Sequence, residues 1–130
     1  MSQENAEVAR SHQEAWNRRD LRTWLGLFCS DAEIDWSRAR GPFKGVYRGP
    51  REFEAFWDVF WSTFDDVQVE LYGLAEAGSE VVYSNTAYMR GRDGIEVSAR
   101  STFVYTIENG QITRFRMFQE RAEALEAVGL

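Results

Sequence analysis

Only a few side chains in the chain could carry acid–base chemistry, and the first of them is its single histidine. His12 is the one side chain whose ordinary pKa lies near neutrality. It falls within an apolar pattern of helical spacing, so we expect it on the inner side of a helix, pointing into a pocket. There it could act as a general base or hydrogen-bond a substrate carbonyl. The alternative is a half-buried structural histidine, paired with a backbone carbonyl or with Tyr88.

A second candidate catalytic group is the carboxylate of Asp35, at the end of a predicted short strand. Asp35 is expected at the pocket rim, where Arg38 or Arg40 could pair with it across the turn. A salt-bridged acid has a lowered pKa and is a poor base. A structural ion pair is therefore the favoured interpretation. The nearby basic residues could also attract an acidic ligand, or form only a solvated surface.

Aromatic side chains are the third feature, at 15% of the chain, with five Trp, five Tyr and nine Phe. So much ring surface predicts either a thick core or a cavity lined by rings. We expect Tyr88 and Gln119 to orient a ligand by hydrogen bonds. The alternation predicts these ligand-binding residues: Trp16, Trp36, Trp57, Phe60, Tyr88, Ser101, Phe103, Met117 and Gln119. The alternative is that the same rings fill the interior and leave no cavity.

Composition excludes several classes of protein. A net charge of −6 argues against nucleic acid and anionic membranes as partners, since both need a positive surface. One cysteine, Cys29, excludes an internal disulfide and a thiolate zinc site, and one histidine excludes a multi-histidine metal site. We expect no metal and no cofactor. No apolar run approaches the ~20 residues of a membrane span, and the polar N-terminus is unlike a signal peptide, so a cytoplasmic protein is predicted.

The helices that must position these groups follow from apolar spacing. Residues 6–16 are predicted as a first helix, and residues 21–28 as a second that Asp20 caps and Ser30-Asp31 ends. A third runs from Pro50 to Phe64, with rings at i, i+3, i+4 and i+7. Residues 37–49, rich in Gly, are expected to form a loop.

Strand patterns fill most of the rest. Residues 32–36 alternate as a short strand, and further strands follow at 67–71, 81–90, 95–107 and 112–119. Gly78-Ser79 and Arg92-Asp93-Gly94 mark turns, and Asn109-Gly110 is a strong hairpin signal. Residues 121–128 can close as a short helix. The 130 residues make one domain of the α+β class. We expect a cone-shaped, curved antiparallel sheet with three N-terminal helices on its concave face, in the manner of a cystatin-like barrel.

This pattern resembles the nuclear-transport-factor-2-like superfamily, and its SnoaL-like branch in particular. The resemblance covers roughly residues 7–119. The segments that carry it are Asn17-x-x-Asp20-Leu21, Leu27-Phe28-x-x-Asp31-Ala32, Tyr47-Arg48-Gly49, Glu108-Asn109-Gly110-Gln111-Ile112 and Arg114-Phe115-Arg116. The resemblance implies the cone fold but no single activity, because this fold hosts isomerases, hydrolases, cyclases and binding modules.

The acid–base groups of the superfamily's enzymes are missing here. In similar ketosteroid isomerases the place of the general base corresponds to Trp36, and that of the tyrosine in the first helix to His12. No carboxylate stands on the face of Ala99 and Ser101, where a second oxyanion donor would fall. The acids of limonene-epoxide hydrolases and SnoaL-type cyclases correspond to positions that include Tyr88 and Met117.

Two functions are therefore carried forward. The first is a pocket protein that binds a small, mostly apolar molecule and isomerises, cyclises or hydrates it. The second is a non-catalytic ligand carrier or dimeric interaction module. A homodimer through the outer sheet face is also predicted, because that face would combine arginines with apolar side chains. Its expected residues are Ser98, Arg100, Thr102, Val104, Thr106, Ile112, Arg114, Arg116 and Phe118.

Overall fold

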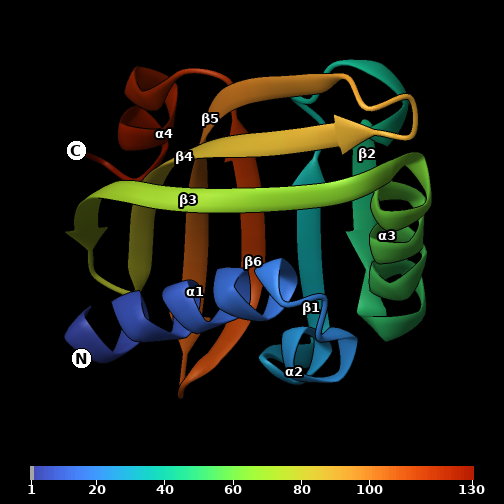
Figure 1. The fold of residues 1–130 in the computed structure, drawn as a ribbon. Coiled ribbons are helices and arrows are strands. Elements are labelled where there is room, and N and C mark those ends of the chain that lie inside the picture. Colours follow the sequence, from blue (N-terminus) through green and yellow to red (C-terminus); the bar gives the residue numbers. More distant parts are fainter. Residues whose placement is uncertain (1) are drawn as a thin grey trace.

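The computed structural model describes residues 2–130, in which a curved sheet wraps around helices (Figure 1). The helices are α1 (Ser2–Asn17), α2 (Leu21–Gly26), α3 (Gly49–Thr63) and α4 (Arg121–Ala127), with a 3-10 turn at Gly41–Phe43. The strands are β1 (Phe28–Trp36), β2 (Gly45–Arg48), β3 (Phe64–Ala77), β4 (Glu80–Gly91), β5 (Glu96–Glu108) and β6 (Gln111–Phe118). No helix among residues 2–130 is long and apolar enough to cross a bilayer.

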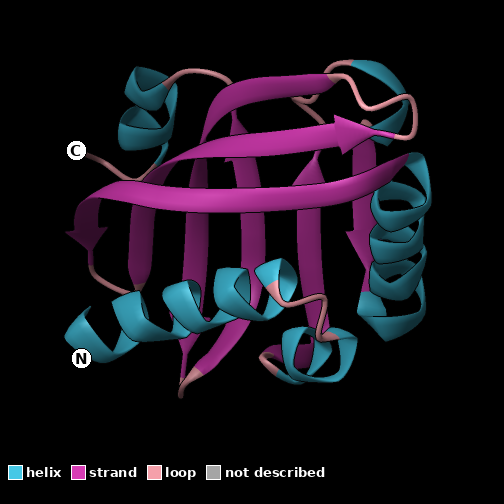
Figure 2. Ribbon diagram, viewed as in Figure 1, coloured by secondary structure: helices cyan, strands magenta, loops and turns pink. Residues whose placement is uncertain are grey.

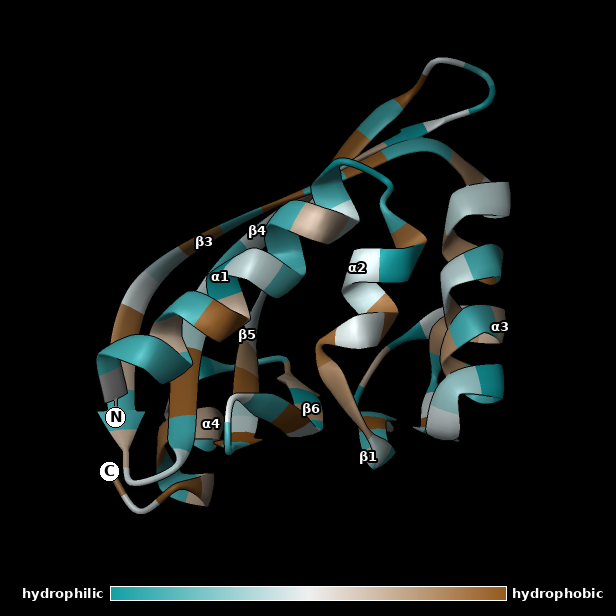
Figure 3. Ribbon diagram, turned by 90° about the horizontal axis from the view of Figure 1, so that it is seen from below, coloured by the Kyte–Doolittle hydropathy of each residue, from teal (hydrophilic) through white to brown (hydrophobic). Residues whose placement is uncertain are grey.

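Within the described residues, the strands form one open sheet in the order β2-β1-β6-β5-β4-β3. Helices α1, α2 and α3 lie on its concave side, and α4 packs outside (Figure 2). Seen from below, β3 arches around α1, with α2 between α1 and α3 (Figure 3). This is the predicted α+β cone. The pairs along the β3–β6 meander are antiparallel, but β1 pairs with β6 in parallel, bringing together the first and last strands of the chain.

Local signals account for most element boundaries. Asp20 caps α2, since its carboxylate accepts hydrogen bonds from the backbone N–H and the hydroxyl of Thr23, at 3.2 and 2.7 Å. The turn between β5 and β6 is Asn109-Gly110, whose φ angles of 53° and 77° are those that Asn and Gly tolerate in a tight hairpin. The proline predicted at the start of α3 lies in its first turn.

Two predictions of secondary structure were wrong. Helix α2 ends at Gly26, because the chain at Leu27 and Phe28 already pairs with Ile112 of β6. The segment expected to be a loop contains β2, which runs antiparallel to β1 from Glu33↔Arg48 to Trp36↔Gly45. A strand of four residues that begins with Gly45 and is followed by Gly49 is too short to show alternation, and the edge of β1 supplies the pairing.

The outer sheet face is less apolar than predicted. Val104 and Phe118 are buried against Ala124 of α4, in a small cluster separate from the main core. Ile112 points inward, because a bulge between Thr106 and Ile107 shifts the register of β5 on β6. The short C-terminal helix therefore covers apolar surface that a partner was expected to cover.

Candidate functional site: an aromatic cavity

A cavity of about 510 Å³ lies between the concave face of the sheet, the end of α1 and helix α3. Helix α3 faces it because its aromatic residues recur at helical spacing and their rings are buried. The alternative of a cone filled by its own rings is therefore wrong.

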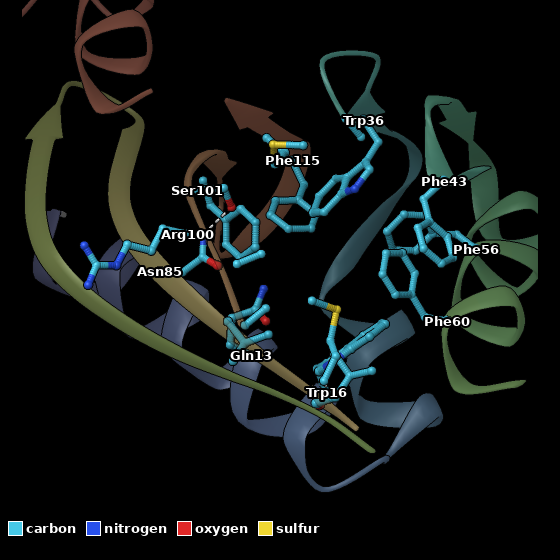
Figure 4. A pocket seen from close by; sticks show the side chains of 18 of the residues that line it. Gln13, Trp16, Trp36, Phe43, Phe56, Phe60, Asn85, Arg100, Ser101 and Phe115 are labelled. Carbon is cyan, nitrogen blue, oxygen red and sulfur yellow. Dashed lines mark hydrogen bonds between the residues drawn. The ribbon is translucent and has the colours of Figure 1, made fainter. Parts of the chain in front are cut away.

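Aromatic rings form one side of this cavity, and they support one another. Trp36 packs on Phe56 and Phe115, with ring centroids 5.2 and 5.3 Å apart. Phe43 and Phe60 stack at 3.9 Å. Figure 4 shows the rings of Phe43, Phe56 and Phe60 gathered opposite the polar side chains. Rings that are already packed need little reordering when a flat apolar molecule enters.

The facing side is a polar wall, which we define as Gln13, Asn85 and Ser101 (Figure 4). Asn85 on β4 and Ser101 on β5 are cross-strand partners, so their side chains lie side by side. The amide Nδ2 of Asn85 donates to the Ser101 hydroxyl at 2.9 Å. Asn85 is fully buried, and among the described residues its Oδ1 atom has no hydrogen-bond partner. Such an atom is costly to leave unpaired, so a polar partner from a ligand would be favourable.

Behind the polar wall lies a buried hydrogen-bonded chain. The amide Nε2 of Gln13 donates to the Tyr105 hydroxyl oxygen, which is 3.0 Å from His12 Nδ1. Burial lowers the pKa of His12 to about 3, so the imidazole is neutral, and burial raises the pKa of Tyr105. Because the Tyr105 oxygen accepts from Gln13, its own proton is available to donate to His12 Nδ1, and in that arrangement the imidazole proton is on Nε2. The whole chain is uncharged at neutral pH.

The prediction that His12 points into the pocket was wrong. His12 is fully buried, stacks on Trp24 with centroids 5.1 Å apart and contacts Phe28 and Phe115 edge-on. It does not line the cavity, whereas the next residue, Gln13, does. One residue turns a helical side chain by about 100°, and apolar spacing could not resolve that step. Gln13 lies three residues before Trp16, which was predicted to line the cavity. Residues three apart share a helix face, so this spacing could have indicated Gln13.

Asp35 also lies away from the cavity. Its carboxylate accepts from the Ser37 backbone N–H and hydroxyl, at 3.0 and 2.6 Å, and contacts Arg38 and Arg114 at 3.5 and 3.7 Å. Burial alone would raise the pKa of Asp35, but the Ser37 hydrogen bonds and the two arginines outweigh it and lower the pKa. Its neighbours Ile34 and Trp36 face inward, so Asp35 faces out. The geometry is that of the structural ion pair.

Two further predicted binding residues do not line the cavity. Tyr88 is 49% exposed and lies on the outer face, because Asn85, Ala87 and Met89 are the residues of β4 that face in. The predicted alternation of this strand was out of phase by one residue, which reverses every side chain. Trp57 is buried in the core against the rings of Trp16 and Trp24.

The remaining predicted residues do line the cavity, namely Trp16, Trp36, Phe60, Ser101, Phe103, Met117 and Gln119. Gln119 uses its amide N–H to donate to the Arg38 carbonyl at 2.9 Å. The sequence analysis missed Gln13, Phe43 and Asn85. Phe43 belongs to the segment predicted as a loop, and Asn85 to the strand whose phase was wrong.

Charge is nearly absent from the cavity. Among residues 2–130, its lining contains no Asp, Glu or His, and Arg40 is one of its two charged residues. The other, Arg100, points its side chain away (Figure 4). No group of three or more His, Cys, Asp or Glu side chains placed to hold a metal occurs in the described part of the chain. The arrangement can bind an uncharged molecule by apolar contact and hydrogen bonds.

The family model of the SnoaL-like domain matches residues 8–115. The chain belongs to the SnoaL-like family. A search of curated protein sequences finds no match. The predicted resemblance to this family is thus confirmed.

Solved structures share the fold of this SnoaL-like protein. An NTF2-like protein of unknown function from Burkholderia pseudomallei is 23% identical over 100% of both chains, with a TM-score of 0.79. RV0760c from Mycobacterium tuberculosis, in complex with estradiol-17beta-hemisuccinate, is 17% identical over 94% of this chain and 97% of its own, with a TM-score of 0.80. Delta 5-3-ketosteroid isomerase from Mycobacterium sp. is 18% identical over 94% and 96%, with a TM-score of 0.78. At these identities the likeness establishes the fold alone.

Proposed function

We propose that this SnoaL-like protein binds a small, mostly apolar and uncharged molecule in its aromatic cavity. One observation carries the proposal: an open cavity of about 510 Å³, walled by rings, is bordered by Asn85, whose buried amide oxygen has no partner among the described residues. The volume is within the usual ~300–1,000 Å³ of small-molecule sites, which combine apolar walls with a few polar groups. The apolar ring system of the estradiol derivative bound to RV0760c supports an apolar, multi-ring ligand for this fold.

We propose further that the protein holds its ligand without acid–base catalysis, as a carrier does. Isomerisation, cyclisation and hydration each need a group that moves a proton at the reacting atom. Among the described residues, the cavity lining offers amides, a hydroxyl, rings and the guanidinium of Arg40, but no carboxylate or imidazole. His12 has its Nδ1 bonded to Tyr105 and lies behind the lining. This favours the non-catalytic of the two functions.

The test fills the cavity from the sheet. Ala87 lines the wall opposite α3, so Ala87→Phe puts a ring into the space. Naphthalene is the probe, measured by isothermal titration calorimetry. We expect binding to wild type and at least a tenfold loss in Ala87→Phe. The matched control Ala55→Phe makes the same substitution at an exposed position of α3 outside the cavity lining and should bind normally. Equal affinity in both variants would place the ligand elsewhere.

We also propose a homodimer through the outer face of the sheet. Tyr72 and Tyr88 lie on this face and are 43% and 49% exposed, and Arg100 lies nearby on β5. Tyr and Arg are enriched in interfaces. Sedimentation should give twice the 15.1 kDa of one chain at micromolar concentration, and Tyr72→Glu with Tyr88→Glu should give the monomer. A wild-type monomer would contradict the proposal.

Two broader proposals complete this picture. We propose that residues 1–130 act as one functional unit, supported by a sheet that joins the first strand to the last. We propose the cytoplasm as its compartment, supported by a single cysteine that can form no disulfide within the chain.

A further inference from the structure

We infer that the cavity recognises its ligand through a hydrogen-bond donor, such as a hydroxyl group on a ring, and binds such a ligand more tightly than one that can only accept. The inference rests on the proposed function and names the chemical group that the polar wall takes. Its basis is the direction of the hydrogen bonds that Gln13, Asn85 and Ser101 already make.

Asn85 supplies the first acceptor. Its amide N–H donates to Ser101 Oγ, which leaves its Oδ1 atom buried without a partner. The residue has no exposed surface, so bulk water does not satisfy this oxygen. A ligand hydroxyl could donate to it, whereas a ketone or ether oxygen would meet it lone pair to lone pair.

Gln13 supplies the second acceptor. Its amide Nε2 donates to the Tyr105 hydroxyl oxygen, and that hydroxyl is also hydrogen-bonded to His12 Nδ1. This fixes which end of the Gln13 amide is free, and among the described residues its carbonyl oxygen makes no hydrogen bond. The buried chain thus orients Gln13, with Tyr105 and His12 as positioning residues.

Ser101 completes the polar wall. Its oxygen accepts from Asn85, so its own proton is free to donate to the oxygen of a ligand hydroxyl. A hydroxyl group donates once and accepts as well, which matches this wall. Two free acceptors are the reverse of an oxyanion hole, which presents donors to a developing negative charge. The wall therefore disfavours carboxylate and enolate groups.

The experiment compares three ligands of one ring shape. They are 2-naphthol, which donates and accepts, 2-methoxynaphthalene, which only accepts, and naphthalene, which does neither. Affinities are measured by isothermal titration calorimetry at pH 7, where the naphthol is neutral. We expect wild type to bind 2-naphthol about tenfold or more tightly than 2-methoxynaphthalene, the usual consequence of a buried acceptor left unpaired.

Three variants show which side chains cause the preference for 2-naphthol over 2-methoxynaphthalene. Asn85→Leu should reduce the naphthol preference to about twofold while retaining naphthalene binding, and Gln13→Leu should reduce it less. Phe60→Leu, on the ring side, should weaken all three ligands by a similar factor and leave the preference intact. Thermal unfolding checks that each variant is folded. Should Asn85→Leu fail to fold, the inference is still tested by the relative affinities of wild type for 2-naphthol and 2-methoxynaphthalene and by the same comparison in Gln13→Leu.

The outcomes separate this inference from the proposed function. If all three naphthalenes bind wild type equally well, or if Asn85→Leu and Gln13→Leu both retain the full naphthol preference, the donor inference is overturned and the apolar cavity proposal stands. If no naphthalene binds wild type, the proposed function fails and the inference fails with it.

Discussion

The concave face of the sheet has a filled end and an open end, although aromatic side chains surround both. At the filled end, the inward cross-strand pairs of β4 and β5 are Val81↔Tyr105 and then Tyr83↔Phe103, where the Phe103 ring borders the cavity. At the open end, the next two inward pairs are Asn85↔Ser101 and Ala87↔Ala99. The helices bring large rings to each end, so the small sheet residues decide where space remains.

Electrostatics separates the two ends as well. At the filled end, His12 Nδ1 and the Tyr105 hydroxyl bond each other in an uncharged buried pair, while His12 Nε2 has no partner among residues 2–130. At the open end, the amide oxygen of Asn85 has no partner among the described residues. Buried polar groups in proteins are normally paired, and an unpaired one needs an explanation. Each end holds an unpaired buried atom, but only Asn85 borders the cavity, where a ligand can supply the missing partner.

The largest expected difference is in the stability lost when a tryptophan is replaced in the filled core or in the cavity wall. Trp57→Ala removes a ring packed in the core and should lower the free energy of unfolding by about 3–5 kcal/mol. Trp36→Ala removes a ring that lines the cavity and is only partly buried, so it should lower it by about 1–2 kcal/mol. Urea denaturation measures both. Trp36→Ala alone should also weaken naphthalene binding. Equal losses of stability would remove the distinction between the two ends.

The pH dependence of stability tests the filled end. The pKa of His12 is lowered from 6.5 to about 3, so the unfolded chain binds a proton that the folded chain excludes. The neutral, buried His12 therefore costs nothing above pH 6.5, and below it the free energy of unfolding falls by up to about 1.4 kcal/mol per pH unit as the pH approaches 3. His12→Gln should lose this part of the acid sensitivity between pH 6.5 and 5, measured by urea denaturation at each pH. It should also reduce stability at pH 7, since the stacking on Trp24 is lost, while ligand affinity is retained. A variant that loses affinity but not stability would return His12 to the site.

The Tyr105 hydroxyl links His12 at the filled end to Gln13 in the polar wall, so Tyr105→Phe tests both ends. Loss of the hydroxyl leaves the Gln13 amide without its partner and should reduce the free energy of unfolding by about 1 kcal/mol. With its amide free to turn, Gln13 can offer N–H or carbonyl to a ligand. The preference for 2-naphthol over 2-methoxynaphthalene should fall by a few-fold, as measured by calorimetry. An unchanged preference would show that the buried chain does not orient Gln13.

Asp35→Asn should have the smallest effect. It removes the charge opposite the half-exposed Arg38 and Arg114 but can keep a hydrogen bond to Ser37. The free energy of unfolding at pH 7 should therefore fall by less than about 1 kcal/mol. Because the pKa of Asp35 is lowered, this contribution is present above its ordinary value of 3.8 and is lost as the pH falls further. Ligand affinity should not change. A clear drop in affinity, found by titration, would bring Asp35 back as a functional residue.

The sequence by itself determined most of the helices and strands and much of the aromatic wall of the cavity. The hairpin at Asn109-Gly110, the Asp20 cap and the ring pattern of α3 rest on local chemistry, which acts within a few residues of the chain. The alternation in β5 was clear, so Ser101 and Phe103 were assigned to the correct face.

Tertiary structure alone decided the rest. The run from Val81 to Tyr83 gives no alternation from which to fix the phase of β4, so Asn85 was missed and Tyr88 was placed on the wrong face. The parallel pairing of β1 with β6 joins segments about eighty residues apart, which no local pattern encodes. Whether rings fill a space or line it depends on the small side chains opposite them, and that juxtaposition exists only once the sheet has formed.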